Sequence, residues 1–316
     1  MNEKNGKAVY ANGKVQVLEY GITEIGKSTF EDIENLVSVV FPESVTNIKE
    51  TPFFGCKKLE SITLPATNDA VRHMAFYGCK RLKKIIVPEG ITCISTAFML
   101  CSALESVKLP ESLTHIDSWT FWGCTSLESV EIPANVCEIS VNPFVRCRAK
   151  ITVSPKNKHF KVVDGNLYTM DGTKLVSYIP KENETHFSVS EGVTVIGHTA
   201  FCDCNNLESV SLPEGLTTLG AYAFQCCKSL KRIALPTTLT IIECSAFDYC
   251  EKLESVYIPK SLAAIEWCAF NRCEKLENVY YSGSKSDWKS INIDRKLNEK
   301  LNGKKAERAL IHYDCD

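Results

Sequence analysis

Cysteine is the residue type in this 316-residue chain that is abundant enough to suggest chemistry, because the chain contains sixteen of them. Thiolates can bind zinc, act as nucleophiles or pair as disulfides. Nine cysteines recur at a spacing of about 23 residues, with one longer gap: Cys56, Cys79, Cys101, Cys124, Cys147, Cys204, Cys227, Cys250 and Cys273. The other seven do not share this spacing: Cys93, Cys137, Cys202, Cys226, Cys244, Cys268 and Cys315.

The nine regularly spaced cysteines are better explained as packing residues than as disulfide partners. Equivalent residues of stacked units lie about 4.8 Å apart, whereas the Cβ atoms of a disulfide lie about 3.8 Å apart with a defined torsion angle. An unpaired cysteine packs as a small apolar side chain. The spacing therefore predicts a ladder of buried thiols, and so many unpaired thiols indicate a reducing compartment or an anaerobic setting.

Metal binding is the second chemistry that cysteines could supply. The pairs Cys202-x-Cys204 and Cys226-Cys227 come closest to a ligand cluster. Structural zinc sites usually combine two spaced pairs of ligands, and one cysteine of each pair here belongs to the regular series. The sequence therefore predicts no metal site and no cofactor. A metal protein or a cytosolic enzyme using the irregular cysteines remains an alternative, to be tested by metal analysis of protein purified under reducing conditions.

Catalytic residues are not predicted, because the polar residues follow the repeat rather than converge on a site. The histidines are scattered along the chain: His73, His115, His159, His186, His198 and His312. The chain lacks G-x-S-x-G, H-E-x-x-H, G-x-G-x-x-G and the phosphate-binding glycine loop. The sequence thus favours a protein that is not an enzyme.

A phenylalanine three residues before each regular cysteine marks the unit that positions these side chains. The series is Phe30, Phe53, Phe76, Phe98, Phe121, Phe144, Phe201, Phe224, Phe247 and Phe270. A unit of this length cannot bury its apolar side alone and must stack on its neighbours, which predicts a solenoid. A solenoid is a scaffold, so its surface decides what it does.

Other apolar residues and prolines repeat at fixed distances from phenylalanine. Leucine follows by six residues, as at Leu104, and residues 104–109 alternate as expected for a short strand. Proline follows by twelve and ends the strand, because it cannot donate to a sheet. These prolines are Pro42, Pro65, Pro88, Pro110, Pro133, Pro213, Pro236 and Pro259. Leu113 and Ile116 then predict a second short extended segment, and Ala97-Phe98 a tight turn.

The resulting pattern, L-x-x-V-x-L-P-x-x-L-x-x-I-x-x-x-A-F-x-x-C, resembles the BspA-like leucine-rich repeat family over residues 25 to 281. The resemblance implies a β-rich (α+β) solenoid, curved as a right-handed superhelix with a parallel sheet on its concave side. It also implies binding or adhesion at a bacterial or protist surface, with no cofactor and no catalysis.

The regular pattern is interrupted once and fades at both ends. Residues 151–190 hold Asp164-Gly165 and Asp171-Gly172 between alternating segments, which predicts an inserted β-hairpin. That hairpin could be a structural spacer or a functional projection. The predicted organisation is an N-terminal cap (1–24), repeats (25–150), the inserted region (151–190), repeats (191–281) and a C-terminal cap (282–316). In the last of these, Ser286 is the expected N-cap of a helix before Trp288, and Ala309 to Tyr313 a final strand.

Charge and location are less informative. The formal net charge of −2 favours neither nucleic acid nor acidic membranes as a partner. The first residues lack the apolar run of a secretory signal, and no run of 18 apolar residues exists. These features and the many thiols predict a cytoplasmic protein, whereas the family resemblance implies a secreted or surface-displayed one. Both alternatives remain open.

The strand face that points away from the core is the expected binding surface. Its residues form two columns, mostly small and polar. Tyrosine and arginine are enriched at interface centres, so the candidate contact residues are Lys84, Lys108, Arg232, Tyr257 and Tyr280. The predicted function is protein–protein interaction or adhesion through this sheet; the alternative is a passive spacer or a module of a larger surface assembly. The partner's identity and the oligomeric state are not predicted.

Overall fold

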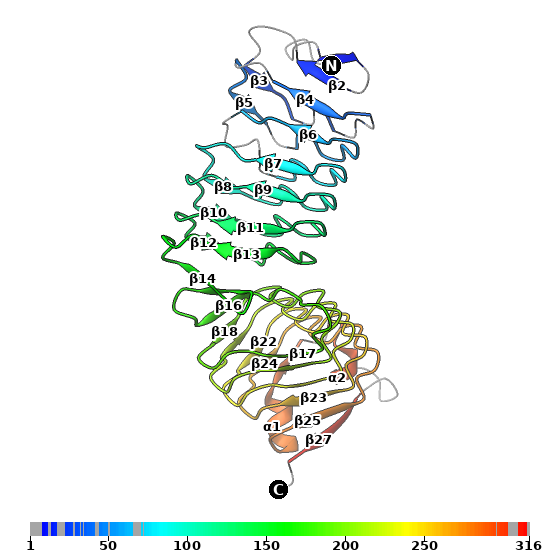
Figure 1. The fold of residues 1–316 in the computed structure, drawn as a ribbon. Coiled ribbons are helices and arrows are strands. Elements are labelled where there is room, and N and C mark those ends of the chain that lie inside the picture. Colours follow the sequence, from blue (N-terminus) through cyan, green and yellow to red (C-terminus); the bar gives the residue numbers. More distant parts are fainter. Residues whose placement is uncertain are drawn as a thin grey trace. The chain divides into compact units, whose positions relative to one another are not determined.

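A computed structural model shows short strands stacked in parallel, with little helix (Figure 1). It describes residues 8–11, 14–17, 23–27, 29–31, 33, 35–41, 44–49, 51–65, 71, 73–294, 296–302 and 309–314. Pro42, Cys315 and most of the predicted N-terminal cap lie outside these residues. The chain forms two compact units, unit 1 (Met1–Gly165) and unit 2 (Asn166–Asp316). The boundary falls inside the region that the sequence predicted to be an insertion.

Unit 1 begins with an antiparallel pair and continues with two series of parallel strands, which we call the broad-sheet and narrow-sheet strands; each series is divided into two sheets in this unit. The antiparallel pair is β1 (Ala8–Ala11) and β2 (Lys14–Val17), and β2 pairs in parallel with β4. The broad-sheet strands are β4 (Ser38–Val40), β6 (Ser61–Ile62), β7 (Lys84–Ile86), β9 (Ser106–Lys108), β11 (Ser129–Ile132) and β13 (Lys150–Val153). The narrow-sheet strands, two residues each, are β3 (Glu24–Ile25), β5 (Asn47–Ile48), β8 (Cys93–Ile94), β10 (His115–Ile116) and β12 (Glu138–Ile139). Strand β14 (Phe160–Val163) ends the unit.

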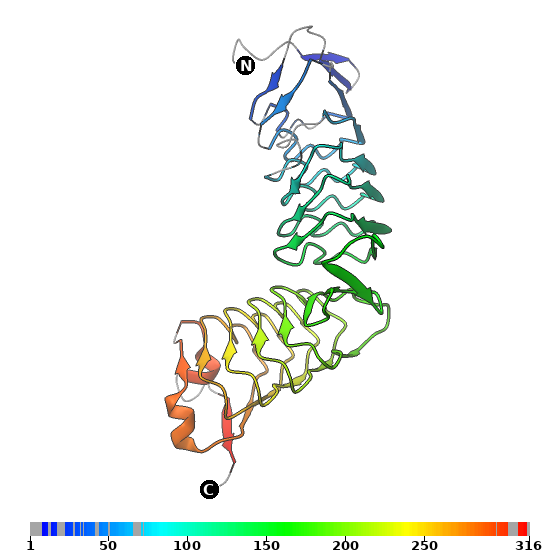
Figure 2. The same ribbon diagram turned by 90° about the vertical axis from the view of Figure 1, so that its left-hand side faces the viewer.

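Unit 2 opens with the antiparallel hairpin of β15 (Asn166–Thr169) and β16 (Lys174–Ser177). The broad-sheet strands are β17 (His186–Ser188), β19 (Ser209–Ser211), β21 (Arg232–Ala234), β23 (Ser255–Ile258), β25 (Asn278–Tyr281) and β27 (Leu310–Tyr313). The narrow sheet continues from β16 through β18 (Val195–Ile196), β20 (Thr218–Leu219), β22 (Ile241–Ile242), β24 (Ala264–Ile265) and β26 (Asn292–Ile293). Figure 2 shows these turns stacked, with helix α1 (Lys285–Ser290) in orange at their C-terminal end.

The predicted solenoid is confirmed by the register of its strands. Within the broad sheet of unit 2, Ser209 pairs with Arg232, Arg232 with Ser255, and Ser255 with Asn278, each step being one repeat of 23 residues. The central residue of each strand faces the core, and Ile233, Val256 and Val279 are buried. Each of these repeats therefore hydrogen-bonds to the next one through its backbone.

Phenylalanine forms a continuous stack inside each unit. In unit 1 the rings from Phe30 to Phe144 lie 5.2 to 5.7 Å apart. In unit 2 Phe201, Phe224, Phe247 and Phe270 stack at 4.8 to 5.4 Å. All ten rings are buried. The repeat phase read from the sequence is thus the packing phase of the core.

Part of the predicted insertion is a repeat of the solenoid. Tyr178, 23 residues before Phe201, stacks on that ring at 5.1 Å. The strand after it keeps the 23-residue register, since Phe187 pairs with Val210, and the strand before it joins the narrow sheet, where Leu175 pairs with Ile196. The sequence predicts residues 174–190 as part of the insertion because its repeats are aligned on phenylalanine. In this repeat the ring position is occupied by Tyr178. The β15–β16 hairpin itself follows the prediction, with Gly172 at φ 80° in its turn.

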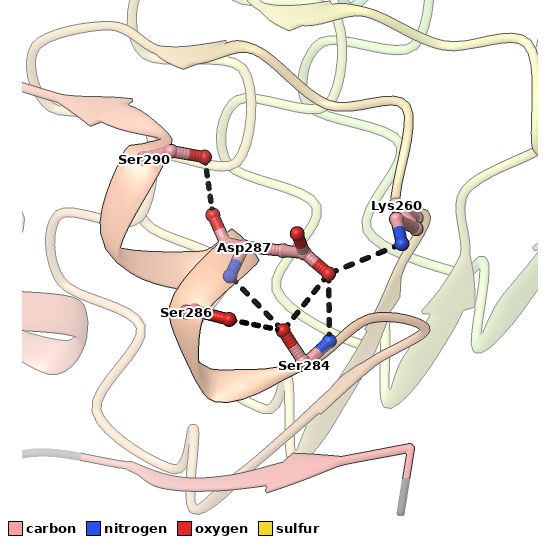
Figure 3. Close-up of polar contacts among 5 residues, drawn as sticks. All are labelled: Lys260, Ser284, Ser286, Asp287 and Ser290. Atoms are coloured by element: carbon pink, nitrogen blue, oxygen red, sulfur yellow. Dashed lines mark hydrogen bonds and ion pairs between the residues drawn. The ribbon is translucent and has the colours of Figure 1, made fainter. Parts of the chain in front are cut away.

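Helix α1 starts two residues earlier than the sequence predicted. Ser284, not Ser286, is the N-cap: its Oγ accepts a hydrogen bond from Asp287 N, at 3.2 Å, and Ser284 N donates to Asp287 Oδ2, at 3.0 Å (Figure 3). The acid three residues after Ser284 completes this capping box. Lys260 Nζ lies 3.2 Å from the same carboxylate.

A second helix, α2 (Glu299–Asn302), follows, and the predicted last strand is β27. Among the described residues no helix is both long and apolar enough to cross a membrane.

Candidate functional site

The regularly spaced cysteines form the predicted thiol ladder. All nine are buried thiols without a disulfide. For seven of them Sγ donates to the carbonyl oxygen of the phenylalanine in the preceding repeat, at 2.9 to 3.3 Å. The burial that surrounds them raises the pKa of the Cys147 thiol to about 11 and those of Cys79, Cys101 and Cys124 well above their usual value. A buried neutral thiol is a poor nucleophile, so these residues serve the core.

The two cysteines of each pair considered as metal ligands differ in exposure. Cys204 and Cys227 lie in the buried ladder, whereas Cys202 and Cys226 are partly exposed. Within the part of the chain that the structure describes, no group of three or more His, Cys, Asp or Glu side chains is arranged to hold a metal ion.

The exposed face of the broad sheet carries all five candidate contact residues, distributed over both units. In unit 1, Lys84 and Lys108 are exposed on adjacent strands but in opposite columns, because Lys84 pairs with Ser106 and Lys108 with Ile86. Ile86 itself is 66% exposed. Unit 1 therefore presents two separate cations beside an apolar side chain rather than one basic cluster.

In unit 2 the structure brings the candidate tyrosines together. The rings of Tyr257 and Tyr280 stack with centroids 4.6 Å apart, and Tyr280 stacks in turn on His312, also at 4.6 Å. His312 Nε2 lies 2.9 Å from Asn278 Oδ1. Sequence reasoning missed His312, because the C-terminal cap abandons the repeat spacing and its register with Tyr280 could not be counted.

A groove of about 450 Å³ adjoins this aromatic stack on the same face. Arg232 and Tyr257 both line it, whereas Tyr280 does not. The remaining walls include residues that the sequence did not single out, among them Ala234, His186 and Glu214. His186 Nδ1 lies 2.8 Å from Ser209 Oγ, which links the first two strands of the groove floor. The groove combines an aromatic ring, a cation and hydroxyl groups, and tyrosine and arginine are enriched at protein interfaces.

A second surface lies one residue after each ladder phenylalanine. In the unit 1 repeats from Phe53 to Phe121 this position is aromatic or apolar, and Phe54 stacks on Tyr77 at 4.7 Å. Met99 and Trp122 continue it, half-buried, and Arg146 lies 5.8 Å from the Trp122 ring centroid. We call these four residues, Phe54, Tyr77, Met99 and Trp122, the unit 1 turn column.

The same position in unit 2 is polar and hydrogen-bonded from repeat to repeat. Asp248 accepts hydrogen bonds from Gln225 Nε2, at 3.0 Å, and from Asn271 Nδ2, at 2.7 Å. The fold thus accommodates either chemistry at this position, so packing alone does not require the aromatic residues of unit 1. Comparison of equivalent positions between the two halves of the sequence could have revealed this contrast.

Comparison with known proteins assigns the repeats. The sequence profile of the family described as BspA type leucine rich repeat region matches residues 17–159 and 178–293, in six copies. No curated protein matches the chain. Among solved structures, a leucine rich cell surface protein from Faecalibacterium prausnitzii is 29% identical, with a TM-score of 0.72, covering 87% of this chain and 81% of that one.

Two further structures share the fold at lower identity. The pneumococcal vaccine antigen PcpA is 19% identical, with a TM-score of 0.63, covering 100% of this chain and 91% of its own. A leucine-rich repeat protein from Eubacterium ventriosum is 21% identical, with a TM-score of 0.56, covering 84% of this chain and 72% of its own. Their resemblance concerns the architecture.

Proposed function

Because this chain belongs to the BspA-type leucine-rich repeat family, we propose that it is a non-enzymatic interaction module that binds a partner protein on the exposed face of its broad sheet. The observation that carries the proposal is that Tyr257, Tyr280 and Arg232 lie on one face of the sheet, where Tyr257 and Arg232 line the groove. Aromatic residues and arginine are the side chains that dominate the energy of protein interfaces.

A preformed sheet suits this role physically. The broad-sheet residues are held by backbone hydrogen bonds between repeats, and their inner neighbours are buried in the core. Binding on such a surface orders few additional groups, so more of the contact energy is retained as affinity. The similarity to a cell surface protein supports an adhesive role outside the cell as the setting for this interaction.

The test is affinity capture with mass spectrometry, comparing the unaltered chain with variants of each unit's sheet face. One variant carries Lys84→Glu and Lys108→Glu, and the other carries Arg232→Glu and Tyr257→Ala. Control variants reverse equally exposed charges away from the sheet: Lys57→Glu with Lys158→Glu, and Lys275→Glu. A partner lost from a sheet variant and retained by its charge-matched control supports the proposal and identifies the unit responsible.

Two other results would redirect the interpretation. A variant with Tyr77→Gln and Trp122→Gln changes the unit 1 turn column to the residue that unit 2 carries at Gln225. If only this variant loses the partner, the binding surface is the turn column and the broad-sheet proposal is wrong. If every variant captures the same proteins as the unaltered chain, the chain is a passive spacer or a module of a larger assembly.

A further inference from the structure

The aromatic stack on the broad sheet of unit 2 ends abruptly at Tyr257. One face of this ring packs on Tyr280, at a centroid distance of 4.6 Å and an interplanar angle of 14°. On the other side, the strand register places Ala234 opposite Tyr257. Alanine provides no ring to continue the stack, and the Tyr257 side chain is 46% exposed. The second ring face is therefore open to the groove.

The space beyond this ring face has small side chains around it. Ser211 and Ala234 are exposed in the same column of the sheet, and Ser209 lies beside them. Together with Tyr257 they line the groove of about 450 Å³. Aromatic rings pair at centroid distances of about 4.5–7 Å, so a planar group placed above Ala234 would continue the ladder at the spacing that Tyr257 and Tyr280 already have.

Charge on the groove favours an anionic partner group. Arg232 precedes Ala234 by two residues on the same strand, so both side chains point to the same face. Among the residues that the structure describes, the exposed guanidinium of Arg232 has no ion-pair partner. The Glu214 carboxylate also lines the groove, but it already accepts hydrogen bonds from Thr237 N, at 3.0 Å, and Thr237 Oγ1, at 2.6 Å. The Glu214 carboxylate keeps its negative charge but is held by Thr237, so Arg232 is the charged group of the groove that can pair with a ligand.

We propose that this groove binds a segment of the partner protein through one aromatic side chain, which stacks on the open face of Tyr257, and a neighbouring carboxylate, which pairs with Arg232. This inference rests on the proposed function and names the chemistry of the partner. Arginine binds carboxylates in a two-pronged geometry, and Arg232 lies on the strand next to Tyr257, two residues before the Ala234 that faces the ring. An acidic, aromatic-containing peptide therefore fits the site.

The first experiment selects peptides from a random display library on the full chain and measures their binding to two variants at one position. Ala234→Tyr supplies the missing ring from the protein itself and should close the site. Ala234→Ser keeps the side chain small and serves as the matched control. Tyrosine already occupies the equivalent position in the next two repeats, at Tyr257 and Tyr280, so the fold should tolerate it; equal thermal unfolding midpoints verify this.

The expected result is that selected peptides combine an aromatic residue with Asp or Glu and bind Ala234→Tyr about 3- to 10-fold more weakly, the range that loss of one aromatic pair gives. Binding to Ala234→Ser should be unchanged. Arg232→Gln should weaken the same peptides, and changing the peptide's Asp to Asn should weaken them equally. If the two groups interact, combining both changes adds little further loss.

Two results would overturn this inference. Selected peptides without aromatic residues, or peptides that bind Ala234→Tyr as well as the unaltered chain, would show that the ring face is not used. The second result would come from a glycan array tested in parallel. If acidic sugars bind the unaltered chain but not Ala234→Tyr, and no peptide shows this difference, the groove binds carbohydrate. Loss of a captured partner in Arg232→Glu with Tyr257→Ala, but not in Ala234→Tyr, would leave the proposed function standing and refute only the stacking.

Discussion

Each ladder cysteine occupies a position where another small apolar side chain would fit, and its S–H donor is what distinguishes it. The phenylalanine carbonyl that accepts this thiol also accepts a backbone N–H within its own turn; Phe53 O, for example, accepts from Cys56 N, at 3.1 Å, and from Cys79 Sγ, at 3.3 Å. A carbonyl oxygen has two lone pairs, and the thiol satisfies the second one inside the core. The ladder therefore joins neighbouring repeats by side chains as well as by backbone.

The thiols should make the fold sensitive to alkaline pH. In the unfolded chain a cysteine ionises near pH of about 8.5, whereas burial raises the pKa of Cys147 to about 11 in the folded chain and that of Cys124 well above its usual value. Above pH of about 8.5 the unfolded state binds fewer protons than the folded one, so stability falls as the pH rises. The stability that the buried neutral thiol of Cys147 contributes is fully present below pH of about 8.5. It is lost as the pH rises to about 11.

Urea unfolding followed by circular dichroism between pH of about 7.5 and 10.5 measures this effect. Each buried thiol can contribute up to about 1.4 kcal/mol per pH unit in this range. Cys124→Ala removes one titrating group and should lower the slope of unfolding free energy against pH. A slope that Cys124→Ala leaves unchanged would mean that the ladder thiols do not determine the alkaline response.

At the scale of the repeat, the turn around most of the ladder phenylalanines has two left-handed residues, one two positions before the ring and one two positions after it. In the fifth repeat of the series these are Trp119, at φ 55°, and Gly123, at φ 73°. Other repeats place non-glycine residues at the same positions, such as Leu100 and Tyr249. The sequence predicted a tight turn here, but this variety of side chains concealed how regular its backbone is.

Gly123→Ala should therefore destabilise the protein by about 1–2 kcal/mol, the cost of a left-handed L-residue. An added Cβ would also meet Leu100 Cδ2 at 2.9 Å. Gly215→Ala is the matched control, because nothing lies within 4 Å of the Cβ it would add and its backbone is not left-handed. Chemical denaturation compares the two variants. Equal effects would show that the turn relaxes around the added methyl group without strain.

The sequence correctly predicted features whose residues recur at a fixed spacing. It mispredicted features that a single residue determines, such as the start of a helix. The ring ladder and thiol ladder followed from a spacing seen many times. The N-cap was misplaced because several serines surround α1, and only Ser284 has an acid three residues later. The stacking of Tyr280 on His312 could not be foreseen, because the C-terminal cap does not keep the repeat spacing and only the structure shows that His312 pairs with Tyr280.

At the scale of the whole molecule, each unit has its own ladder and each repeat packs on its neighbours. The core of unit 2 runs from Tyr168 to Ala309 and includes four ladder phenylalanines. In such arrays stability is approximately a sum over repeats and the interfaces between them. A break in one repeat should therefore spread to adjacent repeats before it reaches distant ones.

Phe121→Ala tests this expectation, since Phe121 is fully buried and stacks on Phe98 and Phe144. The variant should lose about 3–5 kcal/mol of stability. Hydrogen exchange with mass spectrometry should show faster exchange in the repeats around residues 98 and 144, and little change near Phe247. A loss below about 1 kcal/mol would contradict the core assignment, and uniform acceleration along the chain would contradict the nearest-neighbour picture.

The presence of Tyr178 in the ring ladder has a consequence for how such a chain can change over evolutionary time. The ladder resumes after the β15–β16 hairpin with a different aromatic residue, and the strand register resumes with it. A repeat can thus follow a segment that is not itself a repeat and still pack on the next repeat. Duplication or deletion of a whole repeat preserves the contacts within the remaining repeats, so the exposed face of the broad sheet can lengthen or shorten by one strand at a time.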